Sequence, residues 1–323
     1  MPRRERLDFK EAIHYVVVRG AVEGEIFFAA RDFMGFPQTP RQGAPQVLKF
    51  AHYLAETRDT CGALLHAYCV EPNRGTLVLT TAGAPLRAFM QRLSGRYARY
   101  LRSRGFAGGR EIFAARYDSK VIAPEYLPHA VRRVHRSPID SGLCRQRVDY
   151  PFSSDRAYGG EEAFLPVNMV DVRAALELRG YFGSRGYRNF MDQAETPYLA
   201  NLLSHGSPLD SRIVGDKVFV QKARHRAAHP PVLPSREELI EGVARLLNCS
   251  AAEIFASTHT GALGRALVAW YGVRSGAATV TEVAHWFSVT GATLGQAIRH
   301  QRHMRPGLFA LTLLPQPRSE SID

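Results

Sequence analysis

The chain has 323 residues, of which 45% are hydrophobic and 22% are charged, and its formal net charge is +12. This composition is typical of a globular protein and excludes a disordered one. No run approaches the roughly 18 apolar residues that span a bilayer. The basic N-terminus lacks the apolar core of a signal peptide, so we expect a cytoplasmic protein.

The cysteines predict neither a disulfide framework nor a zinc site. Four of them are scattered along the chain, at Cys61, Cys69, Cys144 and Cys249. Such a small and widely spaced set does not suit a disulfide-rich scaffold. No CxxC motif or Cys/His pair at zinc spacing occurs, so a structural zinc is not expected.

The positive charge is concentrated in the first half of the chain. Residues 1–150 hold 24 Lys/Arg against 14 Asp/Glu, whereas the remaining 173 residues carry a surplus of only two positive charges. Most of the basic residues are arginines, which favour bidentate recognition of phosphate. A localised basic region predicts a polyanionic partner, most often nucleic acid. The alternative is a solvated basic surface without a specific partner.

The predicted elements of the first half alternate between strands and helices. Residues 12–20 and 25–30 are β-branched or aromatic runs broken by glycine-containing turns, which predicts two strands. Apolar residues at helical spacing predict a helix over 44–57, and two apolar runs within 61–81 predict a hairpin. An amphipathic helix follows over 85–105. This order predicts an α+β fold in which an antiparallel sheet carries its helices on one face.

The second half is predicted to be mostly helical. A Pro- and His-rich stretch over 223–234 is typical of a linker. Beyond it, Ser235, Ser250 and Thr279 are each followed three residues later by Glu, which indicates capping boxes at the starts of helices. The predicted boundaries are 1–160 for a nucleic-acid-binding domain, 161–234 for an irregular helical extension and linker, 235–306 for a separate all-α domain, and 307–323 for a tail.

Two arginine-rich segments are candidates for phosphate contacts. On the helix over 85–105, one face carries Arg92, Arg96, Arg99 and Arg102. Few acidic residues accompany them in the sequence, which favours phosphate contact over a salt-bridged surface. Tyr97 and Tyr100 lie at a spacing that suits core packing better than stacking on bases.

A second basic cluster occupies residues 129–138. Its arginines are Arg132, Arg133 and Arg136. They are predicted to line a nucleic-acid groove. His135 in the same cluster is interpreted as a polar helix residue rather than as a base or a metal ligand.

The motifs of the first 160 residues occur in a familiar order. They are an opening PRR…HY-V-RG, the hairpin LHAYCVEPN, the helix RLSGRYARYLRSR, an aromatic–Arg–Tyr–Lys stretch that ends at Lys120, and YPFSSDRAY. Over residues 1–160 this order resembles the REP-associated single-tyrosine transposases. The resemblance implies a ferredoxin-like fold, a homodimer, and cleavage of single-stranded DNA near hairpins. It also implies a His-hydrophobic-His metal site and one tyrosine nucleophile.

That set of residues has a clear chemical purpose. Two imidazoles on alternate strand residues point to one face and can hold Mg²⁺ or Mn²⁺ on the scissile phosphate. The tyrosine then attacks phosphorus and keeps the DNA covalently attached.

The catalytic positions implied by the resemblance are substituted in this chain. Arg74 and Thr76 stand at the two histidines, and Arg133 stands at the tyrosine. An arginine cannot ligate a cation, and one threonine hydroxyl is a poor ligand. We therefore expect no metal cofactor and no catalytic residues. Arg74 and Arg133 are predicted either to retain phosphate binding or to be solvent-exposed remnants.

The segment 279–306 has the spacing of a helix-turn-helix motif. A short helix meets a turn near 288–291, and the following helix carries polar residues able to reach base edges, namely Thr293, Gln296, Arg299 and Arg302. Residues 235–305 resemble the C-terminal DNA-binding domain of the replication initiator DnaA. Thr290 and Gly291 replace the acidic-histidine pair of that domain, so its sequence preference does not carry over.

Together these features predict a domesticated, catalytically inactive transposase-like protein that binds hairpin or single-stranded DNA. A nucleoid-associated transcriptional regulator is the expected role. Two alternatives stay open at this point. One is an active transposase with a rebuilt catalytic site, and the other is an RNA-binding regulator, because a surface that reads hairpins does not require deoxyribose.

Overall fold

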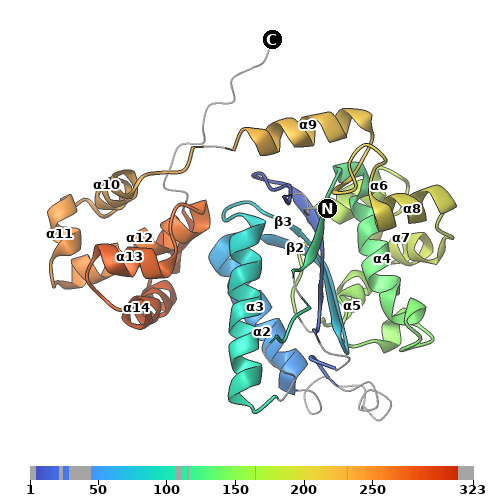
Figure 1. Cartoon of the computed structure of the whole chain (residues 1–323), viewed down its shortest axis with the longest axis horizontal. Helices are drawn as coiled ribbons and strands as arrows, with labels where there is room; N and C mark the ends of the chain where they lie inside the picture. The colour runs from blue at the N-terminus through green and yellow to red at the C-terminus, as the bar shows by residue number, and fades with distance from the viewer. Residues whose placement is uncertain are drawn as a thin grey trace. The chain divides into compact units, whose positions relative to one another are not determined.

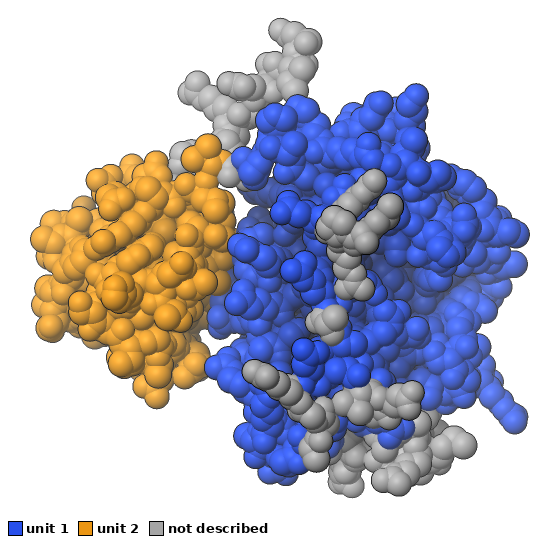
Figure 2. All heavy atoms as spheres, viewed as in Figure 1, with its two compact units in different colours: residues 1–230 blue, residues 231–323 orange. Residues whose placement is uncertain are grey.

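The computed structural model describes residues 5–21, 25–28, 45–106, 111–114, 116–163, 165–230 and 232–311. The chain divides into two compact units, residues 1–230 (unit 1) and residues 231–323 (unit 2), which are coloured separately in Figure 2. Each unit has its own hydrophobic core. None of the helices in these described ranges is both long and apolar enough to cross a membrane.

Unit 1 is an α+β structure built on a five-stranded sheet. Its strands are β1 (Ile13–Arg19), β2 (Leu64–Glu71), β3 (Arg74–Thr80), β4 (Asp118–Ile122) and β5 (Ile213–Val214). The strand order is β2-β3-β1-β4-β5. The first four strands pair antiparallel, whereas β5 pairs parallel to β4. The predicted antiparallel sheet is therefore a mixed sheet, because a short strand from far along the chain extends its edge.

One predicted strand does not form in the described part of its range. Residues 25–28 have no strand structure, and 29–30 lie outside the described residues. Ile26, Phe27 and Phe28 are nevertheless buried. These apolar residues therefore pack in the hydrophobic core and do not extend the sheet.

Helices cover both faces of the sheet, which corrects the prediction of helices on one face. The three principal helices are α2 (Pro45–Cys61), α3 (Leu86–Ser103) and α4 (Leu127–Asp140). Figure 1 shows α2 and α3 on one side of the sheet and α4 on the other. The physical reason lies in β3, where Leu77, Val78 and Leu79 are all fully buried although consecutive side chains point to opposite faces.

The segment after α4 belongs to the same core. It contains α5 (Asp155–Gly159), α6 (Val170–Glu177), α7 (Gly183–Asp192), α8 (Pro197–His205) and α9 (Lys217–Ala228). Tyr187, Phe190 and Leu202 of these helices join the hydrophobic cluster of the sheet. The predicted irregular extension is therefore largely structural support for α4.

Residues 223–228 of the predicted linker over 223–234 belong to helix α9. The linker prediction is therefore wrong for these residues. The Asp216 carboxylate accepts a hydrogen bond from the Phe219 backbone N–H and caps the start of this helix. Val220 and Ala223 are buried in a small cluster with Phe9. This long-range packing holds the first six residues of the predicted linker in a helix, and the prolines lie beyond its end.

Unit 2 is all-α over its described residues. Its helices are α10 (Arg236–Leu247), α11 (Ala251–Phe255), α12 (His259–Ser275), α13 (Val280–Trp286), α14 (Gly291–Met304) and α15 (Pro306–Ala310). The predicted capping boxes at Ser235, Ser250 and Thr279 are confirmed, each with its reciprocal Glu. Helix α12 is the most deeply buried and forms the centre of the unit.

Candidate functional site

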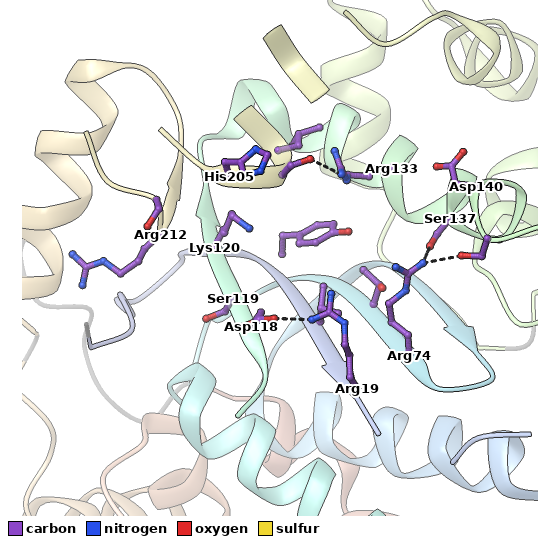
Figure 3. Close-up of a pocket in the computed structure, with 17 residues that line it drawn as sticks. Arg19, Arg74, Asp118, Ser119, Lys120, Arg133, Ser137, Asp140, His205 and Arg212 are labelled. Atoms are coloured by element: carbon purple, nitrogen blue, oxygen red, sulfur yellow. Dashed lines mark hydrogen bonds and ion pairs between the residues drawn. The ribbon is translucent and has the colours of Figure 1, made fainter. Parts of the chain in front are cut away.

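A pocket of about 690 Å³ opens in unit 1 on the face of the sheet that α4 covers. Strands β1, β3 and β4 form its floor, while α4, the end of α8 and the loop near Arg212 form its walls (Figure 3). Arg74, Thr76 and Arg133 all line this pocket. The structure thus brings together the three substituted positions singled out in the sequence.

The strand register decides which side chains share the pocket floor. Tyr15 of β1 lies opposite Lys120 of β4, and Arg19 lies opposite Arg74 of β3. Because side chains alternate along a strand, Tyr15 and Arg19 project from β1 to the same face. Both line the pocket, as does Lys120.

Arg74 is held by its own surroundings. Its guanidinium donates to the Glu71 carboxylate and to the hydroxyls of Ser137 (2.5 Å) and Ser141 (3.1 Å). Glu71 is 3% exposed and also accepts hydrogen bonds from both serines. Burial lowers the pKa of Arg74, but the hydrogen bond and the charge of Glu71 outweigh burial and raise it. Arg74, with a side chain that is 35% exposed, therefore ties the β2–β3 hairpin to α4 through the buried Glu71.

The residues at this place do not fit a divalent metal. Arg74 brings a fixed positive charge, and Thr76 offers one hydroxyl from a side chain that is almost fully buried. The nearby Glu71 carboxylate is already occupied by Arg74 and the two serines. Across the described ranges, no three His, Cys, Asp or Glu side chains gather in a way that could hold a metal ion.

Arg133 bridges α4 to α8 rather than pointing freely into solvent. Its guanidinium donates to the Ala200 carbonyl (3.2 Å) and to the Ser204 hydroxyl (2.7 Å). It also lies 3.8 Å from the Glu195 carboxylate. Its side chain is 31% exposed, so one part of it still faces the pocket.

The other two arginines of this cluster are less accessible than the sequence predicts. Arg132 is 2% exposed, lies over the Phe190 ring, and is 3.7 Å from Glu195. Arg136 is half-buried and donates weakly to the Met191 carbonyl at 3.4 Å. The predicted groove position is wrong for Arg132, because the helices after α4 cover that face.

The arginines of the α3 stripe differ in exposure and in ion pairing. Arg96 forms an ion pair with Glu56 of α2 and lies 4.4 Å from the centre of the Tyr53 ring. The expectation of an unpaired stripe is wrong at Arg96, because its acid comes from a neighbouring helix. Arg99 and Arg102 are exposed, whereas Arg92 is half-buried. The core role predicted for Tyr97 is confirmed by its complete burial.

Two pocket residues were missed by the sequence-based prediction of the site. The Lys120 ammonium makes no hydrogen bond or ion pair with any of the described residues. Burial lowers the pKa of Lys120, Asp118 opposes that change, and Arg133 and Arg19 add to it. Burial likewise raises the pKa of Tyr15, against the attraction of Arg133 and Arg74. Only the sheet register, which the sequence does not reveal, puts these two side chains together.

In unit 2, most of the predicted base-reading residues lie on the surface. Thr290 caps α14 by accepting a hydrogen bond from the Thr293 backbone N–H at 3.1 Å. Thr293, Gln296 and Arg299 are exposed on this helix. Arg302 is instead half-buried and lies 4.9 Å from the centre of the Trp270 ring. It therefore packs against the core of the unit.

Comparison with known proteins gives one weak structural likeness. No family model matches the chain, and no curated protein matches it. Among solved structures, the chain is similar to a REP-associated tyrosine transposase bound to a REP hairpin. The two share 17% sequence identity with a TM-score of 0.36, and the alignment covers 52% of this chain and 93% of that chain.

Proposed function

We propose that the chain is a transposase-like DNA-binding protein that holds hairpin or single-stranded DNA without metal-dependent cleavage. The observation that carries this proposal is the pocket in which Arg74, Thr76 and Arg133 meet. It is rich in cationic side chains, yet the described residues that line it offer no ligand set for a divalent metal. A regulator that binds DNA and leaves it intact is the role that suits these properties.

The arrangement of unit 1 supports the fold implied by the sequence resemblance. The chain passes through β1, α2, β2, β3, α3 and β4, and the sheet order is β2-β3-β1-β4 with antiparallel neighbours. This βαββαβ connectivity supports a ferredoxin-like fold for residues 13–122. The resemblance also implies a homodimer, which we include in the proposal.

Charge supports DNA as the partner. The chain carries a net charge of +12, mostly from its first half. Arg99 and Arg102 are exposed on α3, where they suit contacts with backbone phosphates. In unit 2, α13 and α14 are joined by a short turn and α14 exposes polar residues near its start, which supports a helix-turn-helix reading element.

Binding without metal is the first expected result. The purified full chain should shift a fluorescent DNA hairpin equally well in EDTA and in Mg²⁺ or Mn²⁺, because no step of binding needs a divalent ion. A denaturing gel of the same reactions should show neither nicked DNA nor a covalent protein–DNA adduct. A metal-dependent nick or adduct would contradict the proposal in favour of an active transposase. Tighter binding to the same hairpin made of RNA would favour the RNA-binding alternative.

Helix α14 should contribute to affinity and sequence preference. Arg299→Ala is expected to weaken hairpin binding by about 1–3 kcal/mol if Arg299 contacts a base, and Gln296→Ala should reduce discrimination between hairpin sequences. Fluorescence anisotropy with a panel of hairpins measures both effects. Arg245→Ala is a matched control, since it removes one exposed arginine from α10 of the same unit. Equal losses in the Arg245 and Arg299 variants would argue against a reading role for α14.

A further inference from the structure

We propose that the pocket of unit 1 binds one phosphate group of a nucleic acid through Lys120 and Tyr15, with Arg133 beside them. This inference rests on the proposed DNA-binding function and assigns the main contacts to Lys120 and Tyr15, which lie outside the substituted catalytic positions. The ligand is a phosphate ester, carried either by the end of a strand or by an internal linkage.

Most arginines of the pocket already have carboxylate partners. Arg74 is paired with the buried Glu71. Arg19 lies 2.8 Å from Asp118, and Arg212 lies 2.7 Å from Asp210. These guanidiniums contribute to the local positive potential, but a ligand would have to compete with a protein anion for their hydrogen bonds.

Lys120 differs from these arginines. Asp118 of the same strand attracts the Lys120 charge, but that carboxylate already accepts a hydrogen bond from Arg19. Figure 3 shows the Lys120 amine pointing into the space bordered by Arg19, Arg74 and Arg133. Burial and two neighbouring guanidiniums lower its pKa. An anion bound in the pocket would raise the pKa of Lys120 again, because it would supply a counter-charge for the ammonium group.

Tyr15 adds a second donor at the same point. It lies directly opposite Lys120 in the β1–β4 pairing, so the two side chains are neighbours on one face. No hydrogen bond joins its hydroxyl to another of the described residues, and burial raises its pKa. The phenol therefore stays protonated at neutral pH and can donate. A tetrahedral phosphate, with several acceptor oxygens, can satisfy an ammonium and a hydroxyl together.

The size of the pocket indicates more than a bare ion. About 690 Å³ is in the range of pockets that hold small organic ligands. Ser204 and Ser211 also line it. They can contact a sugar or a second phosphate, so a nucleotide unit suits the space better than inorganic phosphate alone.

The test uses the full chain and two short probes, the thymidine dinucleotide with a 5′-phosphate and the same dinucleotide without it. Titration calorimetry should show binding by the wild type. Lys120→Gln should weaken that binding about tenfold and Tyr15→Phe about threefold, since each removes one donor to a charged acceptor. Lys120→Arg should retain most of the affinity. The control Lys222→Gln removes an exposed lysine from α9 and should leave affinity unchanged.

The outcomes separate this inference from the proposed function. If the wild type binds hairpin DNA but neither dinucleotide, or if Lys120→Gln and wild type bind the dinucleotides equally, the pocket assignment is wrong and DNA binding stands. If the wild type binds no DNA of any kind, the proposed function fails first. A Lys120-dependent preference for the 5′-phosphorylated probe identifies a strand end as the occupant. Equal, Lys120-dependent binding of both probes identifies an internal phosphate.

Discussion

Replacing Arg74 by alanine should lower the free energy of unfolding of unit 1 by about 3 kcal/mol. Glu71 is 3% exposed, and Arg74 is its only cationic hydrogen-bond partner among the described residues. Removing the guanidinium leaves a buried carboxylate with the hydroxyls of Ser137 and Ser141 alone. An uncompensated buried charge costs far more than the loss of an exposed ion pair.

Urea denaturation can assign this loss to the correct unit. Both tryptophans, Trp270 and Trp286, lie in unit 2, so their fluorescence reports that unit by itself. Far-UV circular dichroism reports both units. The Arg74→Ala change should shift the dichroism transition to lower urea concentration and leave the tryptophan transition in place.

The double variant Glu71→Gln/Arg74→Met is the matched control. It removes both charges and should be less destabilising than Arg74→Ala, because no carboxylate remains unpaired in the protein interior. If the single and double variants lose equal stability, the ion pair is not what holds the hairpin against α4. The cost would then come from packing.

This expectation changes how Arg74 can be used to study DNA binding. A loss of affinity in Arg74→Ala would mix a destabilised hairpin with a lost phosphate contact, since β3 forms part of the pocket floor. Lys120 is the better probe, because its ammonium holds no other described element in place. Arg74 thus has a structural role that the sequence resemblance alone does not reveal.

Local patterns predicted the elements whose signals lie within one segment. The three capping boxes of unit 2 formed as expected, since a serine or threonine and a glutamate three residues later need no distant partner. Strand β1 likewise forms within the β-branched and aromatic run that predicted it. By contrast, β5 and α9 depend on contacts with β4 and Phe9, which no local pattern encodes.

The candidate site likewise contains features that local sequence could predict and features that depend on tertiary packing. Glu71 and Arg74 flank a two-residue turn and are directly opposite in the β2–β3 pairing. Their ion pair could therefore be predicted from the hairpin in the sequence. The partner of Arg96 on α2 and the burial of Arg132 could not be predicted from the sequence, because both result from packing between helices. Tyr15 and Lys120 meet only through the pairing of β1 with β4.

Acidification from pH 7 to pH 5 should destabilise unit 1 through His135. This side chain is fully buried, with Nδ1 2.7 Å from the Tyr187 hydroxyl and Nε2 2.6 Å from the Ser154 hydroxyl. Burial lowers the pKa of His135 to about 4, Asp155 opposes that effect, and Arg147 adds to it. The imidazole is therefore neutral in the folded protein at pH 5.

The sign of the pH effect follows from proton uptake. An unfolded histidine has a pKa of about 6.5, so between about pH 6.5 and pH 4 the unfolded chain binds a proton that the folded chain excludes. Stability in that window rises with pH by about 1.4 kcal/mol per pH unit for one such group. The contribution is complete above the unfolded pKa and is lost progressively as pH falls. At pH 5 the expected loss is about 2 kcal/mol.

His135→Gln tests this assignment, because glutamine can still hydrogen-bond but does not titrate. The variant should be less stable than wild type at pH 7, yet its stability should fall less steeply between pH 6.5 and pH 5. His129 also has a pKa lowered to about 4, first by burial and then by Arg132 and Arg179, so some slope should remain. Urea midpoints from far-UV circular dichroism measure the slope. Parallel pH profiles in wild type and variant would rule out His135 as the titrating group, because only the loss of its proton uptake can flatten the curve.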